Sequence, residues 1–130
     1  MLNRLDELIK MKADFTFETT LSTISYKQLI QKAHENGYFV SLIFIWLNSD
    51  KLAIKRVKNR VKSGGHNIPT DVIERRYKRG INNLANVFVN LSDYCLVVDN
   101  SKSPISLIFE KKLGINRVID SIKWNIINSK

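Results

Sequence analysis

The sequence contains a single cysteine, Cys95, and no apolar run long enough to cross a membrane. One cysteine allows no internal disulfide, and the apolar neighbours of Cys95 predict a small core residue rather than a nucleophile or metal ligand. The longest apolar run, Tyr38 to Leu47, has ten residues, whereas a membrane-spanning helix needs about 20. The amino-terminal residues also lack the basic-then-apolar layout of a secretory signal. We therefore expect a cytoplasmic protein with no membrane partner.

Internal repeats, low-complexity tracts and interdomain linkers are also lacking. A chain of 130 residues with 44% hydrophobic and 25% charged residues has the size and composition of one globular domain. His66 has no second histidine, cysteine or carboxylate near it at metal-ligand spacing. We predict a single domain over residues 1–130 and no metal site.

Positive charge is present in excess, and most of it lies in one segment. The formal net charge is +9, and residues 51–79 contain ten Lys or Arg against two acids, Asp71 and Glu74. Such a segment favours phosphate-bearing partners: nucleotides, nucleic acid or an anionic membrane surface. A merely solvated basic face is the alternative. Tyr77 is its one aromatic residue, which is unfavourable for stacking single-stranded nucleic acid.

Apolar periodicity predicts alternating helices and strands. Aromatic and polar residues alternate over 15–20, as in a strand, and the run 38–47 is typical of a strand covered on both faces. Ser49 or Asp50 can cap a helix, residues 63–69 break it, and Thr70 starts the next one. Further strands are expected near 94–98 and 105–109, and further helices near 2–9, 26–36 and 118–127. This order indicates an α/β fold with a parallel sheet and crossover connections.

Polar side chains follow the predicted strands, where open α/β sheets bind their ligands. They are Glu18, Thr19 and Thr20 after the first strand, Asn48 and Ser49 after the second, and Asp99, Asn100 and Ser101 after the third. A carboxylate at Glu18 could accept a substrate hydroxyl. A solvent-facing strand residue is the alternative for Glu18.

Arginines are paired at helical spacing on both basic helices. Arg56 and Arg60 are four residues apart, as are Arg75 and Arg79, beside Arg76. Guanidinium groups grip phosphate oxygens two at a time. The Gly64-Gly65 break lets the two helices fold together as a lid over a transferred phosphate. Helix-surface charge is the alternative for each arginine.

These patterns together resemble a known family. Residues 15–22 (FTFETTLS) are similar to the FxFETTLS segment of the zeta-toxin-like P-loop kinases, some of which are described as predicted ABC-type ATPases. The resemblance continues through residues 37–47, Arg56-Val57, Arg60-Val61, residues 64–66 (GGH), 68–69 (IP), 73–77 (IERRY) and 99–101 (DNS). It covers most of the chain from about Phe15 onward.

The resemblance implies an ATP- and Mg²⁺-dependent kinase with an incomplete P-loop kinase-like sheet and a helical arginine-rich lid over about 50–86. In zeta toxins the substrate is a nucleotide-activated amino sugar, phosphorylated on a sugar hydroxyl. By motif, Glu18, Thr19 and Thr20 resemble the substrate side. Arg60 with Arg75 or Arg76 resembles the catalytic lid arginines, and Asn100 and Ser101 correspond to the nucleotide side. An antitoxin partner is implied as well.

One part of the family pattern is missing. None of the five glycines belongs to the phosphate-cradling loop G-x-x-x-x-G-K-[ST], and the family's acidic catalytic base has no obvious counterpart. We therefore expect an amino-terminally truncated kinase domain that is inactive alone. Two alternatives stay open: a basic module that binds nucleic acid or an acidic partner, and a structural remnant whose complementary fragment carries the missing strand.

Overall fold

A four-stranded sheet forms the centre of the molecule in a computed structural model that describes residues 2–129. The strand order is β1-β2-β3-β4, with β1 at Ser41–Trp46, β2 at Tyr94–Asp99, β3 at Ser106–Lys112 and β4 at Ile115–Val118. β1 and β2 are parallel, whereas β3 and β4 are antiparallel to their neighbours. The α/β class is confirmed, but the expectation of a wholly parallel sheet is wrong. The causes are two short connections: residues 100–105 return β3 antiparallel to β2, and the turn at Gly114 (φ +76°) folds β4 back onto β3 as a hairpin.

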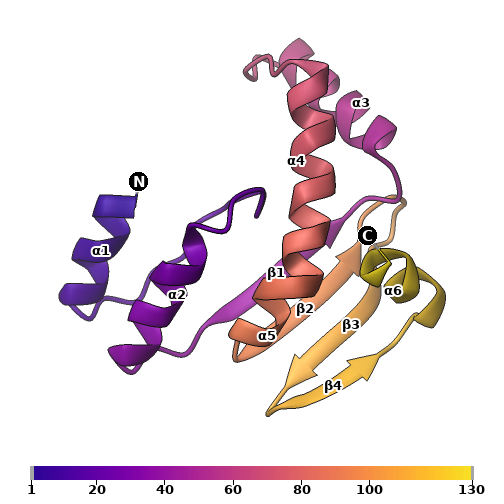
Figure 1. Cartoon of the computed structure of the whole chain (residues 1–130). Coiled ribbons are helices and arrows are strands. Elements are labelled where there is room, and N and C mark those ends of the chain that lie inside the picture. Colours follow the sequence, from indigo (N-terminus) through magenta and orange to yellow (C-terminus); the bar gives the residue numbers. More distant parts are fainter. Residues whose placement is uncertain (1, 130) are drawn as a thin grey trace.

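The helices lie in two groups around this sheet. α1 (Leu2–Lys10) and α2 (Tyr26–Glu35) lie beside the β1 edge, away from β2 (Figure 1). The crossover from β1 to β2 contains α3 (Asp50–Lys62), α4 (Thr70–Asn83), a π-helical stretch η1 (Leu84–Phe88) and the short α5 (Val89–Leu91). α6 (Ser121–Asn128) follows β4 and packs on β3.

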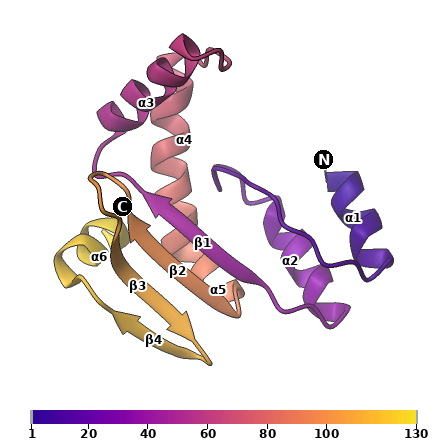
Figure 2. The same cartoon turned by 180° about the vertical axis from the view of Figure 1, so that it is seen from behind.

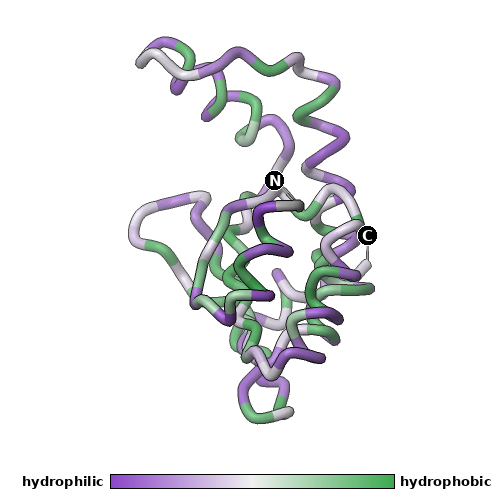
Figure 3. Tube along the Cα trace, turned by 90° about the vertical axis from the view of Figure 1, so that its left-hand side faces the viewer, coloured by the Kyte–Doolittle hydropathy of each residue, from purple (hydrophilic) through white to green (hydrophobic). Residues whose placement is uncertain are grey.

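The predicted pair of basic helices is confirmed. The Ser49 hydroxyl caps α3 by accepting a hydrogen bond from Leu52 N at 3.1 Å. α3 ends at Lys62, where Gly64 adopts φ +95° and Gly65 N donates to Arg60 O at 2.7 Å. The hairpin of α3 and α4 stands beyond the carboxyl end of β1 and carries many hydrophilic positions (Figures 1 and 3).

The main core lies between the sheet and the helices on one of its faces. Cys95, Val97 and Phe109 are almost completely buried, and η1 adds Leu84 and Phe88. The ring of Trp124 stacks on Phe109 with centroids 4.0 Å apart. Cys95 is thus a core residue, as predicted, and burial raises the pKa of its thiol to about 11.

Residues 15–20 form no strand, so that prediction is wrong. Phe15 and Phe17 turn instead into a smaller cluster with α1 and α2, where Phe15 lies 6.0 Å from Tyr38 and Phe17 lies 5.2 Å from Tyr26 between ring centroids. The alternation of aromatic and polar residues does have a structural effect, because it turns Phe15 and Phe17 to the same, partly buried side of the segment. It lacks the neighbouring backbone that a ladder requires, since the ladder of β1 runs only to β2.

β1 is not covered on both faces, contrary to the prediction. Trp46 faces the core, whereas Ile43 and Ile45 are 62% and 58% exposed. Ile45 is in register with Val98, which in turn pairs with Leu107, so apolar side chains continue across this face. Figure 2 shows that none of the helices of the crossover lies over it. Parallel strands normally have helices on both faces of the sheet. In the described residues, the helices of the crossover cover only one face (Figure 2).

Candidate functional site

The substrate-side segment predicted from sequence is exposed and held by its own hydrogen bonds. Glu18, Thr19 and Thr20 are all exposed, and Leu21 follows them into the core. The Thr19 hydroxyl accepts from Leu21 N at 3.2 Å, and the Thr20 hydroxyl donates to Ser22 Oγ at 2.9 Å. The Thr19 hydroxyl therefore keeps its own proton available for a ligand oxygen.

This segment lies against α4. Asn83 Nδ2 donates to Leu21 O at 2.6 Å. The backbone of Thr20 meets Gly80 so closely that a side chain at Gly80 would collide with Thr20 O. The structure thus holds Thr20 and Leu21 against the carboxyl-terminal half of α4.

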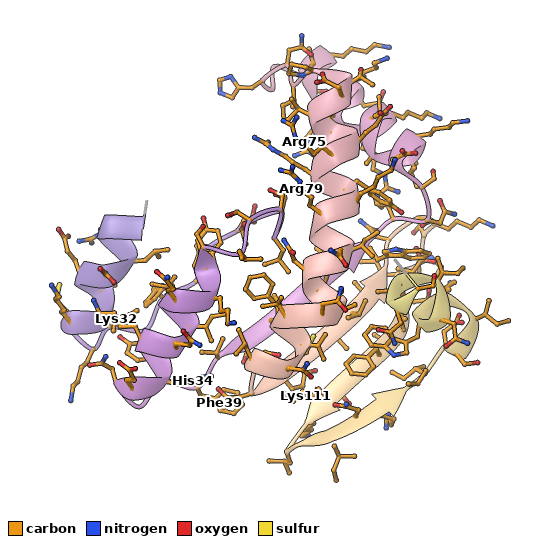
Figure 4. The ribbon with its side chains drawn as sticks, in the orientation of Figure 1. Lys32, His34, Phe39, Arg75, Arg79 and Lys111 are labelled. Carbon is orange, nitrogen blue, oxygen red and sulfur yellow. The ribbon has the colours of Figure 1, made fainter. Side chains whose placement is uncertain are left out.

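Three of the arginines named from sequence lie on the same helix. Arg75 and Arg79 extend from α4 on the side where residues 13–22 lie (Figure 4). Arg76 precedes Gly80 by one turn of α4, so it shares the helix face that meets Thr20. Arg75, Arg76 and Arg79 are exposed, and among residues 2–129 none of them forms an ion pair with a carboxylate.

Arg60 lies elsewhere. It occupies the last turn of α3, near the tip of the hairpin, and its side chain is exposed. In the part of the chain that the structure describes, no hydrogen bond or ion pair joins its guanidinium to Glu18. Arg75, Arg76 and Arg79 thus lie on the helix that contacts Thr20 and Leu21, whereas Arg60 lies on α3.

Asn100 and Ser101, predicted on the nucleotide side, connect the carboxyl ends of β1 and β2. Asn100 N donates to Trp46 O at 2.9 Å, and Asn48 N donates to Ser101 Oγ at 2.9 Å. Arg56 Nη2 donates to Ser101 O at 3.4 Å, so α3 is attached to this loop. Both residues thus have structural partners at the predicted end of the sheet.

Asp99 anchors the same loop. Its Oδ1 accepts from Ser101 N at 2.8 Å, and its Oδ2 lies 2.8 Å from Lys123 Nζ on α6. Burial alone would raise the pKa of this carboxyl, but the hydrogen bonds and charge of Lys123 and the bonds from Ser101 hold its pKa below the ordinary value. Asp99 is therefore ionised and engaged at neutral pH.

Tyr77 joins α4 to the end of β1, a role that the sequence did not reveal. Its hydroxyl donates to Leu47 O at 2.6 Å. Burial first, and then the charges of Asp50 and Asp99, raise the pKa of Tyr77 to about 12. The only sequence signal was its place in the apolar stripe of α4, which indicates burial but no hydrogen bond.

The arginines of α4 fit a phosphate group. The free guanidinium groups of α4 suit phosphate oxygens. Within residues 2–129, no cluster of three or more His, Cys, Asp or Glu side chains is arranged to hold a metal. No described helix has the length and apolar character to cross a bilayer either.

The mixed sheet, with a helical hairpin that carries free arginines beside its strand ends, defines an α/β protein of the P-loop kinase-like class. The Zeta toxin family model matches residues 2–112, and the chain belongs to this family. The family points to a kinase-like or toxin function and to nucleotide and metal use in general.

Comparison with individual proteins adds one relative. A protein of Haemophilus influenzae, described as an uncharacterized protein, is 44% identical over 69 residues, which is 53% of this chain and 49% of the relative. The matched part thus spans about half the length of that relative. No solved structure gives a significant match to the chain.

Proposed function

We propose that this chain supplies the substrate-binding and lid parts of a cytoplasmic zeta-toxin-like kinase, which transfers phosphate to a hydroxyl of a small molecule such as a nucleotide sugar. The observation that carries the proposal is the placement of the arginines of α4. Arg75 and Arg79 have no carboxylate partner within residues 2–129 and extend on the side of α4 where residues 13–22 lie (Figure 4). Arginines that are only solvated do not need a polar segment beside them. Arginines that bind an organic phosphate do, because that segment contacts the rest of the ligand.

Each group then has a chemical task. The arginines hold phosphate oxygens and offset their charge. Glu18 accepts the hydrogen bond of a substrate hydroxyl, and the Thr19 hydroxyl donates to a neighbouring oxygen. Family membership implies ATP as the phosphate source, but the phosphate-cradling loop and a set of metal ligands are not among the described residues. We therefore propose that the isolated chain binds substrate but transfers phosphate slowly, because positioning and charge neutralisation carry most of this chemistry.

Isothermal titration calorimetry tests this proposal, with uridine diphosphate N-acetylglucosamine as the probe. We expect the wild-type chain to bind it and Arg79→Ala to weaken binding about tenfold, the loss of one charge-assisted hydrogen bond. Lys58→Ala on α3 is the matched control, since Lys58 is exposed on the other helix. No binding by the wild type, or equal weakening by Lys58→Ala, would refute the proposal. Sub-millimolar binding of Mg-ATP would contradict the inactivity of the isolated chain.

A second candidate role is that of one partner in a two-chain assembly, with an antitoxin or a complementary fragment as the other. Leu42, Phe44 and Trp46 direct their backbone groups to β2, so those of Ser41, Ile43 and Ile45 point to the open edge of β1. The two isoleucines are also exposed on the bare face. An added strand would use both features. Co-expression with the neighbouring gene product, followed by co-purification at high salt, tests this role, and separate elution would contradict it.

A further inference from the structure

The closest approach between α4 and the substrate-side segment occurs at Gly80. Gly80 is buried, and a Cβ atom at this position would overlap Thr20 O, a backbone atom that cannot swing away. Its φ angle is not among the positive values that favour glycine. The glycine is therefore required by close approach and not by backbone conformation, although it weakens the helix by about 1 kcal/mol relative to alanine.

A second attachment lies one turn further along α4. Asn83 Nδ2 donates to Leu21 O at 2.6 Å. Leu21 is 4% exposed and packs in the core cluster with Ile81 and Leu84. Its backbone has φ +56°, a left-handed conformation that costs a non-glycine residue energy and persists only where the surroundings impose it. The side chain, the carbonyl and the Thr19 hydroxyl together impose it here.

These attachments join the two halves of the proposed site into one body. Arg76, Gly80 and Asn83 are spaced by four and three residues, so they lie along one face of α4. Arg79 immediately precedes Gly80. Below them, Ile81 and Leu84 anchor the helix in the core. The contacts of Gly80 and Asn83 therefore attach Thr20 and Leu21 directly to the helix that carries Arg76 and Arg79.

We propose that Gly80 and Asn83 are positioning residues that fix Glu18 and Thr19 relative to the arginines of α4. This inference rests on the proposed function and deepens it by naming the residues that set the spacing within the site. A ligand that reaches both the arginines and Glu18 depends on that spacing. A simple phosphate would meet the arginines alone.

Two variants test this role with two probes. Gly80→Ala pushes Thr20 away, and Asn83→Leu removes the donor to Leu21 O while keeping the size of the side chain. For uridine diphosphate N-acetylglucosamine we expect both variants to lose about tenfold in affinity, measured by calorimetry. Inorganic pyrophosphate, which carries no hydroxyl-bearing group, should bind all of them within about twofold of the wild type. Lys78→Ala is the control for a change on the surface of α4 and should leave the selectivity between probes unchanged, because Lys78 is exposed and lines a different hollow together with Asn48 and Asp50.

The outcomes separate this inference from the proposed function. Unchanged affinity for the nucleotide sugar in both variants, or equal loss of both probes in both variants, overturns the positioning role while the proposed function stands. If the wild type binds neither probe, the proposed function fails. Amide hydrogen exchange then decides the positioning role, since faster exchange confined to residues 19–22 in Gly80→Ala and Asn83→Leu supports it. Unchanged exchange there overturns it.

Discussion

The hydrogen bond between Tyr77 and Leu47 should help to hold the α3–α4 hairpin to the sheet. The Tyr77 hydroxyl donates to Leu47 O at 2.6 Å, just after β1 ends. Tyr77→Phe removes one oxygen atom and leaves the ring in place. The variant therefore isolates this bond and leaves the carbonyl of Leu47 without its partner.

The expected cost follows from the environment of the bond. An intramolecular hydrogen bond contributes about 1 kcal/mol, and more where the remaining partner is left buried and unpaired. Tyr77 is half-buried between α4 and the end of β1, so we expect a loss of about 1 to 1.5 kcal/mol. For a domain of this size, that lowers Tm by roughly 3–6 °C.

Thermal unfolding followed by circular dichroism at pH 7 measures this loss. Tyr94→Phe is the matched control, because Tyr94 makes a bond of similar length, 2.8 Å from its hydroxyl to Glu110 Oε2, on the uncovered side of the sheet. We expect a smaller drop in Tm for Tyr94→Phe. If Tyr77→Phe melts with the wild type, or if both variants lose the same amount, the Tyr77 bond does not anchor the lid.

The pH dependence gives an independent check. The pKa of Tyr77 is raised from 10.0 to about 12 in the folded protein. The neutral phenol is therefore favoured by folding, and this contribution is complete below pH 10 and is lost as pH rises toward 12. The advantage of the wild type over Tyr77→Phe should shrink across that window. A constant difference from pH 8 to pH 12 would contradict the assignment.

Three other predictions concern the edge strand, the glycine turn and the cysteine. The exposed apolar edge strand β1 predicts self-association, which Ile43→Lys should reduce in light scattering without lowering Tm. Leu42→Lys, which faces the core side, should unfold the chain. A lowered Tm for Ile43→Lys would show that this face is covered. Gly65→Ala should cost about 1 kcal/mol or more in urea unfolding, because its Cβ would lie 2.9 Å from Arg60 O, and an unchanged midpoint would refute this contact. Cys95 should resist a thiol reagent at pH 8 until denaturant is added, since burial raises its pKa to about 11, and rapid labelling of the native protein would contradict its burial.

Local signals in the sequence were sufficient to predict the α3–α4 hairpin, but they were insufficient to predict the sheet. The Ser49 cap and the Gly64-Gly65 break are short-range features, so both helices of the hairpin were predicted. Residues 15–20 carry a strand pattern as well, but a strand needs neighbouring backbone, and no sequence window contains that information. The same reason explains why β1 was expected to be covered on both faces. A continuous apolar run predicts a buried strand. It does not show which helices will cover the two faces of that strand, because this depends on the rest of the fold.

The sequence indicated the candidate site residues, but it did not indicate the residues that hold them in position. Glu18 and Arg75 stood out through their chemistry and through a family resemblance, and their roles stay predictions. Gly80 inside a helix reads only as a weak helix former, and Asn83 as a polar surface residue. Their significance lies in contacts with Thr20 and Leu21, some sixty residues away, which periodicity cannot indicate.

The excess of positive charge over residues 51–79 divides in the structure into two populations with different surroundings. On α3, Lys51, Lys55 and Lys58 are exposed on the outside of the hairpin, where solvation alone accounts for them. On α4, Arg75 and Arg79 stand above a segment that the helix holds through a buried glycine and an asparagine. A solvated face gains nothing from a glycine that weakens its helix or from a leucine in a left-handed conformation. Both the glycine in α4 and the left-handed Leu21 lower the stability of the fold. We explain this loss by the need to fix the distance between the arginines and Glu18, since a phosphorylated substrate with a free hydroxyl would contact both.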